Sequence, residues 1–442
     1  MLEAWGALAT GWVRRTMVEP EATFTFIGFE WLQIFNGPTM YVWYAMMGLA
    51  GLMVMLGWRY KLNMGIYTIL WTGTYLMQKS SYNNHYYLLI LICIVMWLLP
   101  AHRYFSLDVL RKPKLERIAM PRWVYVLVIG QLWIVYTYAS IAKFYPDWLD
   151  GTVATNLMAR KKHYPIVGEL LQYDFAHWSI VWFGLLFDLL IVPALLYKRT
   201  RVLALIVSVF FHLFNSIVFQ IGIFPYLSLA FILFFFSAQT VHRRSLWWKP
   251  FYQADEIRVP TNWIRPVVTY GIPIYLLIQV LLPIRHHVIP GDVLWTEEGH
   301  RMSWRMMLRS RTGRTTYYIQ EKGTNLRQTV NLSDYVTSKQ IRGAKSKPDI
   351  IWAMAQRLKA KEAEAGRDVQ VFVRSMVSIN GQQFRTLIDP GVDLASVPWN
   401  HLEHHDWLLD WEPRAGKGVW WLPWDKPAHR PGTGPLSDTT PQ

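Results

Sequence analysis

The sequence predicts an α-helical membrane bundle of eight or nine transmembrane helices, followed by a small β-rich (α+β) domain outside the membrane. First, 52% of the 442 residues are hydrophobic and only 17% are charged, whereas roughly a quarter of a soluble protein is charged. Second, the apolar residues gather in long runs within the first two thirds of the chain. Third, beyond Pro290 these runs give way to short segments of alternating, β-forming residues.

Eight apolar runs have the character of membrane-spanning helices, although several are shorter than the ~20 residues that a bilayer requires. A further segment, 21–35, is short and aromatic and contains Glu30. It fits either an interfacial helix or a short first span. The eight runs lie at about 40–58, 64–77, 86–99, 123–142, 180–197, 202–219, 223–236 and 267–282.

Changes in composition divide the chain into three parts. Residues 1–285 form the expected transmembrane bundle, and residues 286–415 form the β-rich domain. The strand-like segments of that domain are 314–319, 369–379 and 383–388, and 350–363 is helical. The remaining residues, 416–442, are rich in Pro, Gly and polar side chains and predict a disordered tail.

The formal net charge of +15 comes largely from short loops between the apolar runs. One alternate set of loops holds sixteen Lys and Arg residues and the other holds five. The positive-inside rule places the first set in the cytoplasm, so the loop after Lys143 and everything beyond about Leu282 face a periplasm or lumen. Membrane topology accounts for this charge, and no nucleic acid partner is expected. We also expect Asn84 and His85 to lie at the face opposite Lys143.

Cys93 is the only cysteine, so we expect no internal disulfide and no cysteine-based zinc site. One histidine motif, His401-Leu-Glu-His404-His405, could place three metal ligands on one helix face. Membrane di-iron desaturases need several such motifs at cytoplasmic helix ends, whereas this one lies in the outer domain. We interpret it as a solvated histidine cluster and expect no metal, with a membrane di-iron oxidoreductase as the alternative.

Lys143 stands where the apolar run 123–142 meets a polar segment. A charged lysine beside hydrocarbon costs several kcal/mol unless it is paired or opens onto a water-filled cavity. Burial favours the neutral amine, which is a usable base, and aromatic neighbours such as Trp148 would keep its surroundings dry. The alternative is a lysine that extends from a helix end to the interface. Asp188 lies inside a later span and must also face a partner or a cavity.

Two further polar clusters occur in apolar surroundings. Asn83, Asn84 and His85 begin a span, either as an asparagine cap and an interfacial histidine or as a site that polarises a carbonyl or stabilises a carbanion. His212 and Asn215 lie within an apolar helix and face the bundle interior, either as interhelical bonds or as part of a site.

Several segments occur in the order that one family shares: Lys79–Leu88, Ala142–Trp148, Phe211–Ser216, Phe224–Tyr226, Gly299–Met307, Val377–Asn380, Ile388–Pro390 and Val392–Asp393. Over roughly residues 20–415 the chain resembles the vitamin K-dependent γ-glutamyl carboxylase family, whose helical core is the HTTM domain. The resemblance implies an enzyme of the carbon–carbon lyase class that oxygenates a reduced naphthoquinone with O2 to its epoxide. The strong base made on the way removes a γ-proton from a glutamyl side chain, and the carbanion adds CO2.

The resemblance also implies roles for individual residues. Lys143 would deprotonate the hydroquinone, His85 would support the glutamyl carbanion or its carboxylation, and Asn84 would orient the site. The family's glutamate-recognition region corresponds here to Ser303, Trp304, Met306 and Met307. By position or charge we add Asn83, His212, Asn215, Arg309 and Arg311 as candidate substrate-binding residues.

Departures from the animal enzymes refine these expectations. Those enzymes have a longer lumenal C-terminal portion that helps to bind a propeptide, a disulfide, and a lysine pair where this chain has Ala142-Lys143. We therefore expect a short bacterial-type member in the inner membrane, with a periplasmic C-terminal domain. Its co-substrate would be reduced vitamin K or a menaquinol-type hydroquinone, and its substrate a glutamate-containing peptide or protein. The alternatives are a quinol epoxidase that does not carboxylate and a non-catalytic protein that binds or transports quinone or lipid.

Overall fold

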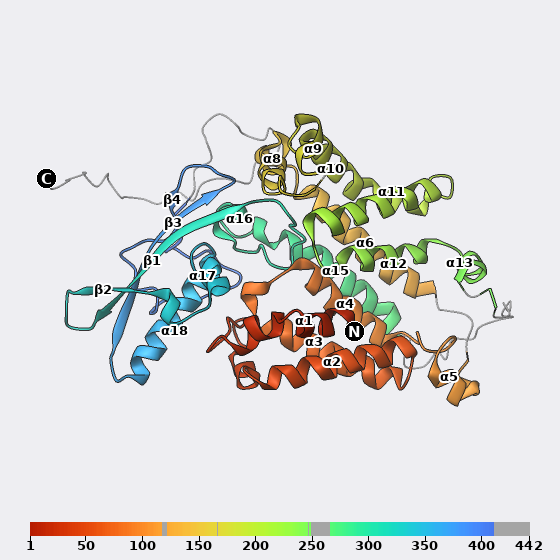
Figure 1. Cartoon of the computed structure of the whole chain (residues 1–442), viewed down its shortest axis with the longest axis horizontal. Helices are drawn as coiled ribbons and strands as arrows, with labels where there is room; N and C mark the ends of the chain where they lie inside the picture. Colours follow the sequence, from red (N-terminus) through yellow and green to blue (C-terminus); the bar gives the residue numbers. More distant parts are fainter. Residues whose placement is uncertain (117–121, 166, 246, 249–265, 411–442) are drawn as a thin grey trace.

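The computed structural model describes residues 1–116, 122–165, 167–245, 247–248 and 266–410. A helical bundle lies beside a smaller part that is built on a β-sheet (Figure 1). The bundle extends to α15 (Ile272–Ile284), and the sheet begins at Arg311. The tail expected at 416–442 lies outside the described residues.

Among these residues, five helices are long and apolar enough to cross a membrane. They are α2 (Thr39–Leu56), α6 (Arg122–Ile141), α10 (Asp174–Leu196), α11 (Arg201–Phe214) with its π-helical extension to Phe219, and the segment Val267–His287 that contains α15. This supports the membrane bundle but not the full count of eight or nine spans.

The other predicted spans form helices that are shorter or more polar. The helices α4 (Asn84–Leu98) and α12 (Phe224–Ile232) are apolar but short. The helix α3 (Tyr60–Met77) carries Lys61 and Asn63, and neighbouring helices bury most of its residues. Its exposed residues include Leu62, Ile66 and Ile69, so its outward face is largely apolar and much of its polarity lies on the buried side. Shorter helices join these elements: α1 (Leu2–Ala9), α5 (Leu107–Arg111), α7 (Pro146–Leu149), α8 (Thr152–Ala159), α9 (Val167–Leu170) and α13 (Ala238–Ser245).

The segment 21–35 does not cross the bundle, because its helical part is the six-residue 3-10 helix Glu30–Phe35. Its earlier residues join the two parts of the molecule. Phe24 packs into the core of the β-rich part, and Phe26 packs into the core of the bundle. The predicted short first span is therefore wrong, and this stretch serves as a connector.

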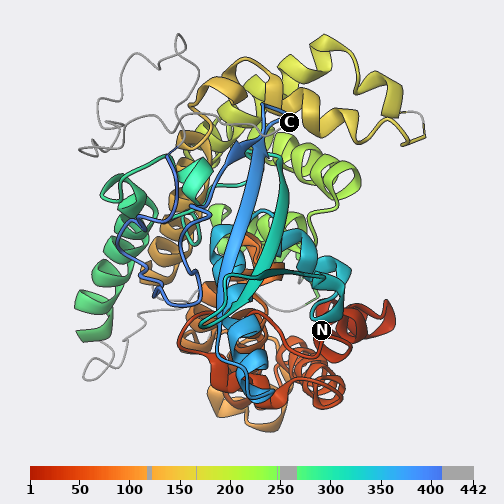
Figure 2. The ribbon, with the colours of Figure 1, turned by 90° about the vertical axis from the view of Figure 1, so that its left-hand side faces the viewer.

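The sheet is antiparallel with the strand order β2-β1-β3-β4. Its strands are β1 (Arg311–Glu321), β2 (Arg327–Val330), β3 (Val369–Ile379) and β4 (Arg385–Thr386). The long strands β1 and β3 run side by side (Figure 2), in register from Arg311 opposite Ile379 to Glu321 opposite Val369. Alternate valines of β3 share a buried core with apolar residues of α18 (Pro348–Glu364), and α16 (Val293–Thr296) and α17 (Ser338–Ala344) complete this part.

The loops that carry His85 and Lys143 lie at the same end of the bundle. The side-chain amide of Asn84 donates to the carbonyl oxygen of Arg305 (3.1 Å), and the hydroxyl of Tyr145 donates to the carbonyl oxygen of Leu308. Both loops thus contact the segment that leads into β1. The expectation of opposite faces is wrong, because α4 and α6 lie between these loops in the sequence and return the chain to the face that it left.

Candidate active site

Lys143 follows the end of α6 and is 6% exposed. Its amine donates to the carbonyl oxygen of Ala139 one turn earlier (3.0 Å) and forms an ion pair with Asp188 of α10. The Trp148 ring lies 5.3 Å from the same nitrogen. Lys143 is therefore held inside the protein and does not extend to an interface, and Asp188 has the partner that its position in a span predicted.

The segment before α4 is fixed by a chain of hydrogen bonds. The Asn83 side chain caps α4 by accepting from the His85 backbone N–H (2.7 Å). Asn84 accepts from the Tyr82 hydroxyl (2.6 Å), which accepts in turn from the backbone N–H of Met302 (2.6 Å). Asn83 thus has the capping role, and Asn84 ties the helix start to the segment that precedes β1.

His85 and His212 lie on either side of one phenylalanine. The His85 ring stacks on Phe224, with centroids 4.1 Å apart, and His212 meets the same ring edge-on at 5.8 Å. The Nδ1 atoms of both histidines are buried and have no hydrogen-bond partner among the residues that the structure describes. These two buried, unpaired ring nitrogens, one in the first turn of α4 and one in the last turn of α11, provide hydrogen-bonding capacity for a bound molecule.

His212 also connects this region to the helix of Lys143. Its Nε2 atom lies 3.0 Å from the hydroxyl of Tyr136, which is on α6 about two turns before Lys143. Asn215 is buried, and its amide donates to the carbonyl oxygen of Phe211 in its own helix (2.9 Å). The structure thus brings His85, His212 and the Lys143 helix into one interior region.

The segment Ser303–Met307 packs against the N-terminal end of α4. The buried Trp304 stacks on Tyr87 with centroids 5.1 Å apart, and Met306 packs against the bundle core. The Ser303 hydroxyl donates to the carbonyl oxygen of His300. The backbone is left-handed at Met302, Trp304 and Met307, an uncommon conformation for such residues that accompanies functional sites.

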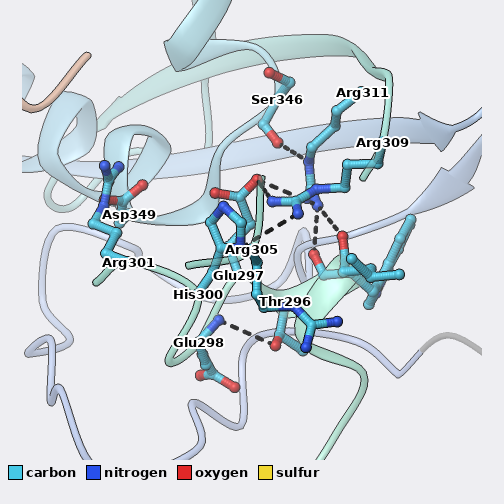
Figure 3. Close-up of polar contacts among 12 residues, drawn as sticks. Thr296, Glu297, Glu298, His300, Arg301, Arg305, Arg309, Arg311, Ser346 and Asp349 are labelled. Atoms are coloured by element: carbon cyan, nitrogen blue, oxygen red, sulfur yellow. Dashed lines mark hydrogen bonds and ion pairs between the residues drawn. The ribbon is translucent and has the colours of Figure 1, made fainter. Parts of the chain in front are cut away.

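Arg309 and Arg311 point at one internal carboxylate, that of Glu297 (Figure 3). The nearest nitrogens of the two guanidinium groups lie 2.6 Å and 3.9 Å from Oε1. Burial alone would raise the pKa of Glu297, but Arg309 and Arg311 outweigh it and hold that pKa well below its usual range. The two arginines predicted to meet a substrate carboxylate are paired within the protein here.

A second carboxylate, Asp349 at the start of α18, bridges the two parts of the molecule. Arg301 donates to it through Nε (3.0 Å) and Nη2 (2.7 Å). Lys79 from the bundle donates to the Asp349 carbonyl oxygen (3.2 Å). Burial would raise the pKa of Asp349, but Arg301 and Lys79 outweigh it and lower that pKa. This link fixes the start of α18 beside the loop that precedes α4.

Cations outnumber carboxylates in this region of the described residues. Around Glu297 and Asp349 lie Lys79, Arg301, Arg305, Arg309, Arg311 and Lys347. Burial, followed by the neighbouring charge of Arg309, holds the pKa of His300 well below its usual value, so that this histidine is neutral. The Nη2 atom of Arg311 is buried without a hydrogen-bond partner among the described residues. An excess of buried positive charge favours the binding of an anion.

Comparison with known families supports this arrangement. The HTTM domain family matches residues 1–239, and the lumenal domain of vitamin K-dependent gamma-carboxylase matches residues 264–414. This chain belongs to the vitamin K-dependent gamma-carboxylase family. It is an integral membrane protein of that family, because several of its helices are long and apolar enough to span a membrane. No solved structure matches the chain.

In this carboxylase-family chain the histidine motif near residue 400 pairs with Glu298, and its His405 is buried, so the predicted solvated cluster is wrong for this residue. The segment is not helical, so its histidines do not share the helix face that a metal motif requires. Glu298 accepts from Nδ1 of His404 (2.7 Å) and of His405 (2.6 Å). Within the described residues no group of three or more His, Cys, Asp or Glu side chains is arranged to hold a metal ion.

Sequence reasoning did not single out Glu297, Tyr136 or Asp349 in this carboxylase-family site. Glu297 comes only a few residues before the recognition segment, in which basic residues are frequent. This nearness in sequence was the available signal. Tyr136 is on α6, seven residues before Lys143, which follows the end of that helix. Asp349 follows Pro348 in a separate helix, and its partner Lys79 is 270 residues away in the sequence.

Proposed function

We propose that this protein is a quinol-dependent γ-glutamyl carboxylase-like enzyme of a bacterial inner membrane. Residues 1–285 would form the membrane bundle, and residues 286–415 a periplasmic domain. The observation that carries the proposal is the buried Lys143–Asp188 pair, which lies at the same end of the bundle as His85 and the cationic region. The low count of basic residues in the loops at this end supports the orientation.

Lys143 would accept the proton of a hydroquinone such as menaquinol or reduced vitamin K. Transfer of the lysine proton to Asp188 leaves a neutral amine and a neutral acid, and a dry site tolerates that pair better than two separated charges. When the amine takes the quinol proton, Asp188 keeps the proton that it received from the lysine, and the quinol anion balances the new ammonium. Trp148 lies 5.3 Å from the lysine nitrogen and helps to exclude water, which strengthens these electrostatic effects.

His85 and His212 would serve the glutamyl substrate after O2 has converted the quinol towards its epoxide. The buried Nδ1 atoms of the two histidines are free among the described residues and can donate to, or accept from, the reacting carboxyl group. Asn83 and Asn84 would fix the position of His85 through the cap of α4 and the bond to Arg305. Asn215 would support His212, which lies less than one turn before it.

The cationic region would bind the glutamyl carboxylate and stabilise the carbanion that attacks CO2. Removal of a γ-proton adds negative charge next to a carboxylate, so fixed positive charges lower the barrier. Arg309 and Arg311 are the candidates; both pair with Glu297, and they follow the Ser303–Met307 segment, whose Trp304 stacks on Tyr87 of α4. Because Glu297 already pairs with both, the substrate would share or replace an internal carboxylate.

One assay tests the proposal. Purified protein receives a reduced naphthoquinone, O2, labelled bicarbonate and a glutamate-rich peptide, with the matching aspartate peptide as control. We expect quinol epoxide together with label in the glutamate peptide, and neither product without the quinol. If neither product forms although the quinone binds, the proposal is wrong and the protein is a binding or transport protein.

A quinol epoxidase without carboxylation is the second candidate. The pairing of Arg309 and Arg311 with Glu297 favours it, since an occupied cationic site leaves less affinity for a substrate carboxylate. In the same assay this candidate yields epoxide but no labelled peptide at any peptide concentration.

A further inference from the structure

A cavity of about 230 Å³ lies between the short helix α1 and the helices α2 and α3. No residue of the candidate active site lines it. The start of α1 approaches the candidate span α2 closely at two glycines: a Cβ at Gly48 would lie 2.0 Å from the Trp5 ring, and one at Gly51 would lie 2.6 Å from the Met1 nitrogen. The cavity is therefore a separate space beside a membrane-spanning helix.

Of the residues that line this cavity, only Glu3 is charged. Its Oε1 atom accepts from the Tyr86 hydroxyl (2.8 Å), and this is the one hydrogen bond that its carboxylate makes among the described residues. The nearby Met1 amine and Arg15 do not line the cavity and form no ion pair with Glu3 in the described part of the chain. A carboxylate in a membrane bundle normally faces a cation or a binding site, so the unpaired Glu3 indicates that the cavity takes a cation.

The other walls of the cavity are mainly aromatic. Trp71 and Tyr86 meet edge to face with ring centroids 5.2 Å apart, and Trp12 and Tyr44 are tilted by 51° at 6.1 Å. Rings set at such angles present faces as well as edges to the space that they share, and an aromatic face attracts a cation. Trp12 already receives one, since the amine of Lys339 lies 4.8 Å from its ring centroid.

We propose that this cavity binds a small organic ammonium cation, with its charge against Glu3 and its alkyl groups against the rings. A carboxylate beside several aromatic rings supplies both the counter-charge and the cation–π contacts by which proteins recognise quaternary ammonium groups. The volume is below the roughly 300–1,000 Å³ of a pocket for a drug-sized ligand and suits a group the size of choline or ethanolamine. The site does not depend on the proposed function.

Equilibrium dialysis of the full-length protein against labelled choline tests the proposal. We expect saturable binding of one choline per chain. An equal concentration of 3,3-dimethylbutanol, which has the shape of choline without its charge, should not displace it, and neither should sodium ions. Absence of saturable binding overturns the proposal. Displacement by the neutral alcohol as strong as that by unlabelled choline also overturns it, because the charge would then have no role.

Three variants assign the binding to the cavity. Glu3→Gln keeps an acceptor for Tyr86 but removes the charge, and choline affinity should fall at least about tenfold. Glu19→Gln, at an exposed residue outside the cavity, is the matched control and should bind as the wild type. Gly6 lines the cavity, and a Cβ added there meets nothing within 4 Å, so Gly6→Phe fills the space and should abolish binding. Wild-type affinity in Glu3→Gln or in Gly6→Phe, each checked for folding by size exclusion, overturns the proposal.

The ammonium group has two sources, a free compound and a lipid head group, and the cavity is only partly enclosed. Choline binding is therefore compared in vesicles of phosphatidylcholine and of an uncharged digalactosyl lipid. Weaker binding in phosphatidylcholine supports the site with the lipid head group as its occupant, because the head group then competes. Equal binding in both supports the site with a free ammonium compound as its occupant.

Discussion

The Lys143–Asp188 pair and the Glu297 cluster are both buried, but their cations differ in kind. In the bundle, one lysine faces one aspartate, and an aromatic ring lies over the amine. In the segment that follows the bundle, Arg309 and Arg311 pair with Glu297, and Arg311 also donates to the carbonyl oxygens of Leu294 and Trp295. A lysine amine can give up its proton, whereas a guanidinium keeps its charge in proteins. The first centre suits proton transfer and the second suits fixed charge.

Apart from the loss of Lys143 itself, exchange of Asp188 for asparagine is expected to have the largest effect. Asp188→Asn keeps the size of the side chain but removes both the proton acceptor and the counter-charge of Lys143. Quinol epoxidation should fall about 10²–10⁴-fold, the usual range for one acid–base group. Epoxide is measured by chromatography after the folded state is checked by size exclusion. Asp174→Asn, at the start of the same helix, is the matched control, and an unchanged rate in Asp188→Asn would remove Asp188 from the mechanism.

The second-largest effect should come from disrupting the Glu297 cluster. Glu297→Gln leaves Arg309 and Arg311 buried without their carboxylate, and loss of one partner of a buried pair costs about 3–5 kcal/mol. The free energy of unfolding is measured in detergent, with Glu321→Gln on the exposed end of β1 as control. A change below about 1 kcal/mol, the size found for surface pairs, would show that the cluster is not structural.

His85→Ala separates the two half-reactions. Because His85 lies beside Phe224 and His212 and not against Lys143, carboxylation should fall at least about tenfold more than epoxidation. Both products are quantified in one reaction with labelled bicarbonate. An equal loss of both products would point to a structural role for this histidine.

The smallest effect is expected for an exposed pair. Lys322 and Asp368 form an ion pair at one end of the sheet, directly after β1 and directly before β3, but their side chains are 56% and 60% exposed. Lys322→Ala should therefore change the free energy of unfolding by less than about 1 kcal/mol. A larger loss would show that surface charge in the outer part matters as much as the buried cluster.

The sequence predicted the parts of this arrangement that depend on local pattern. Apolar runs located the spanning helices, alternation located β1 and β3, and Lys143 stood out as a lysine at the end of an apolar run. The cap at Asn83 followed from its place at a helix start. Family membership was predicted from short motifs whose order matched.

The sequence did not predict pairings that depend on tertiary structure. Lys143 and Asp188 are 45 residues apart, and only the packing of α6 against α10 joins them. Glu297 meets Arg309 and Arg311 because the chain folds back between residues 297 and 309. Several residues of this stretch, including Glu297 and Met307, have left-handed backbone conformations. The polarity of individual helices also misled, since α3 buries polar residues such as Asn63, Thr68 and Thr74 against its neighbours.

The most direct test of the central claim is quinol epoxide formation by the wild type and by Lys143→Ala. We predict that the wild type converts hydroquinone and O2 to epoxide and that Lys143→Ala forms none above background, while Lys162→Ala, on an exposed surface, behaves as the wild type. Epoxide formation by Lys143→Ala at the wild-type rate would contradict the account.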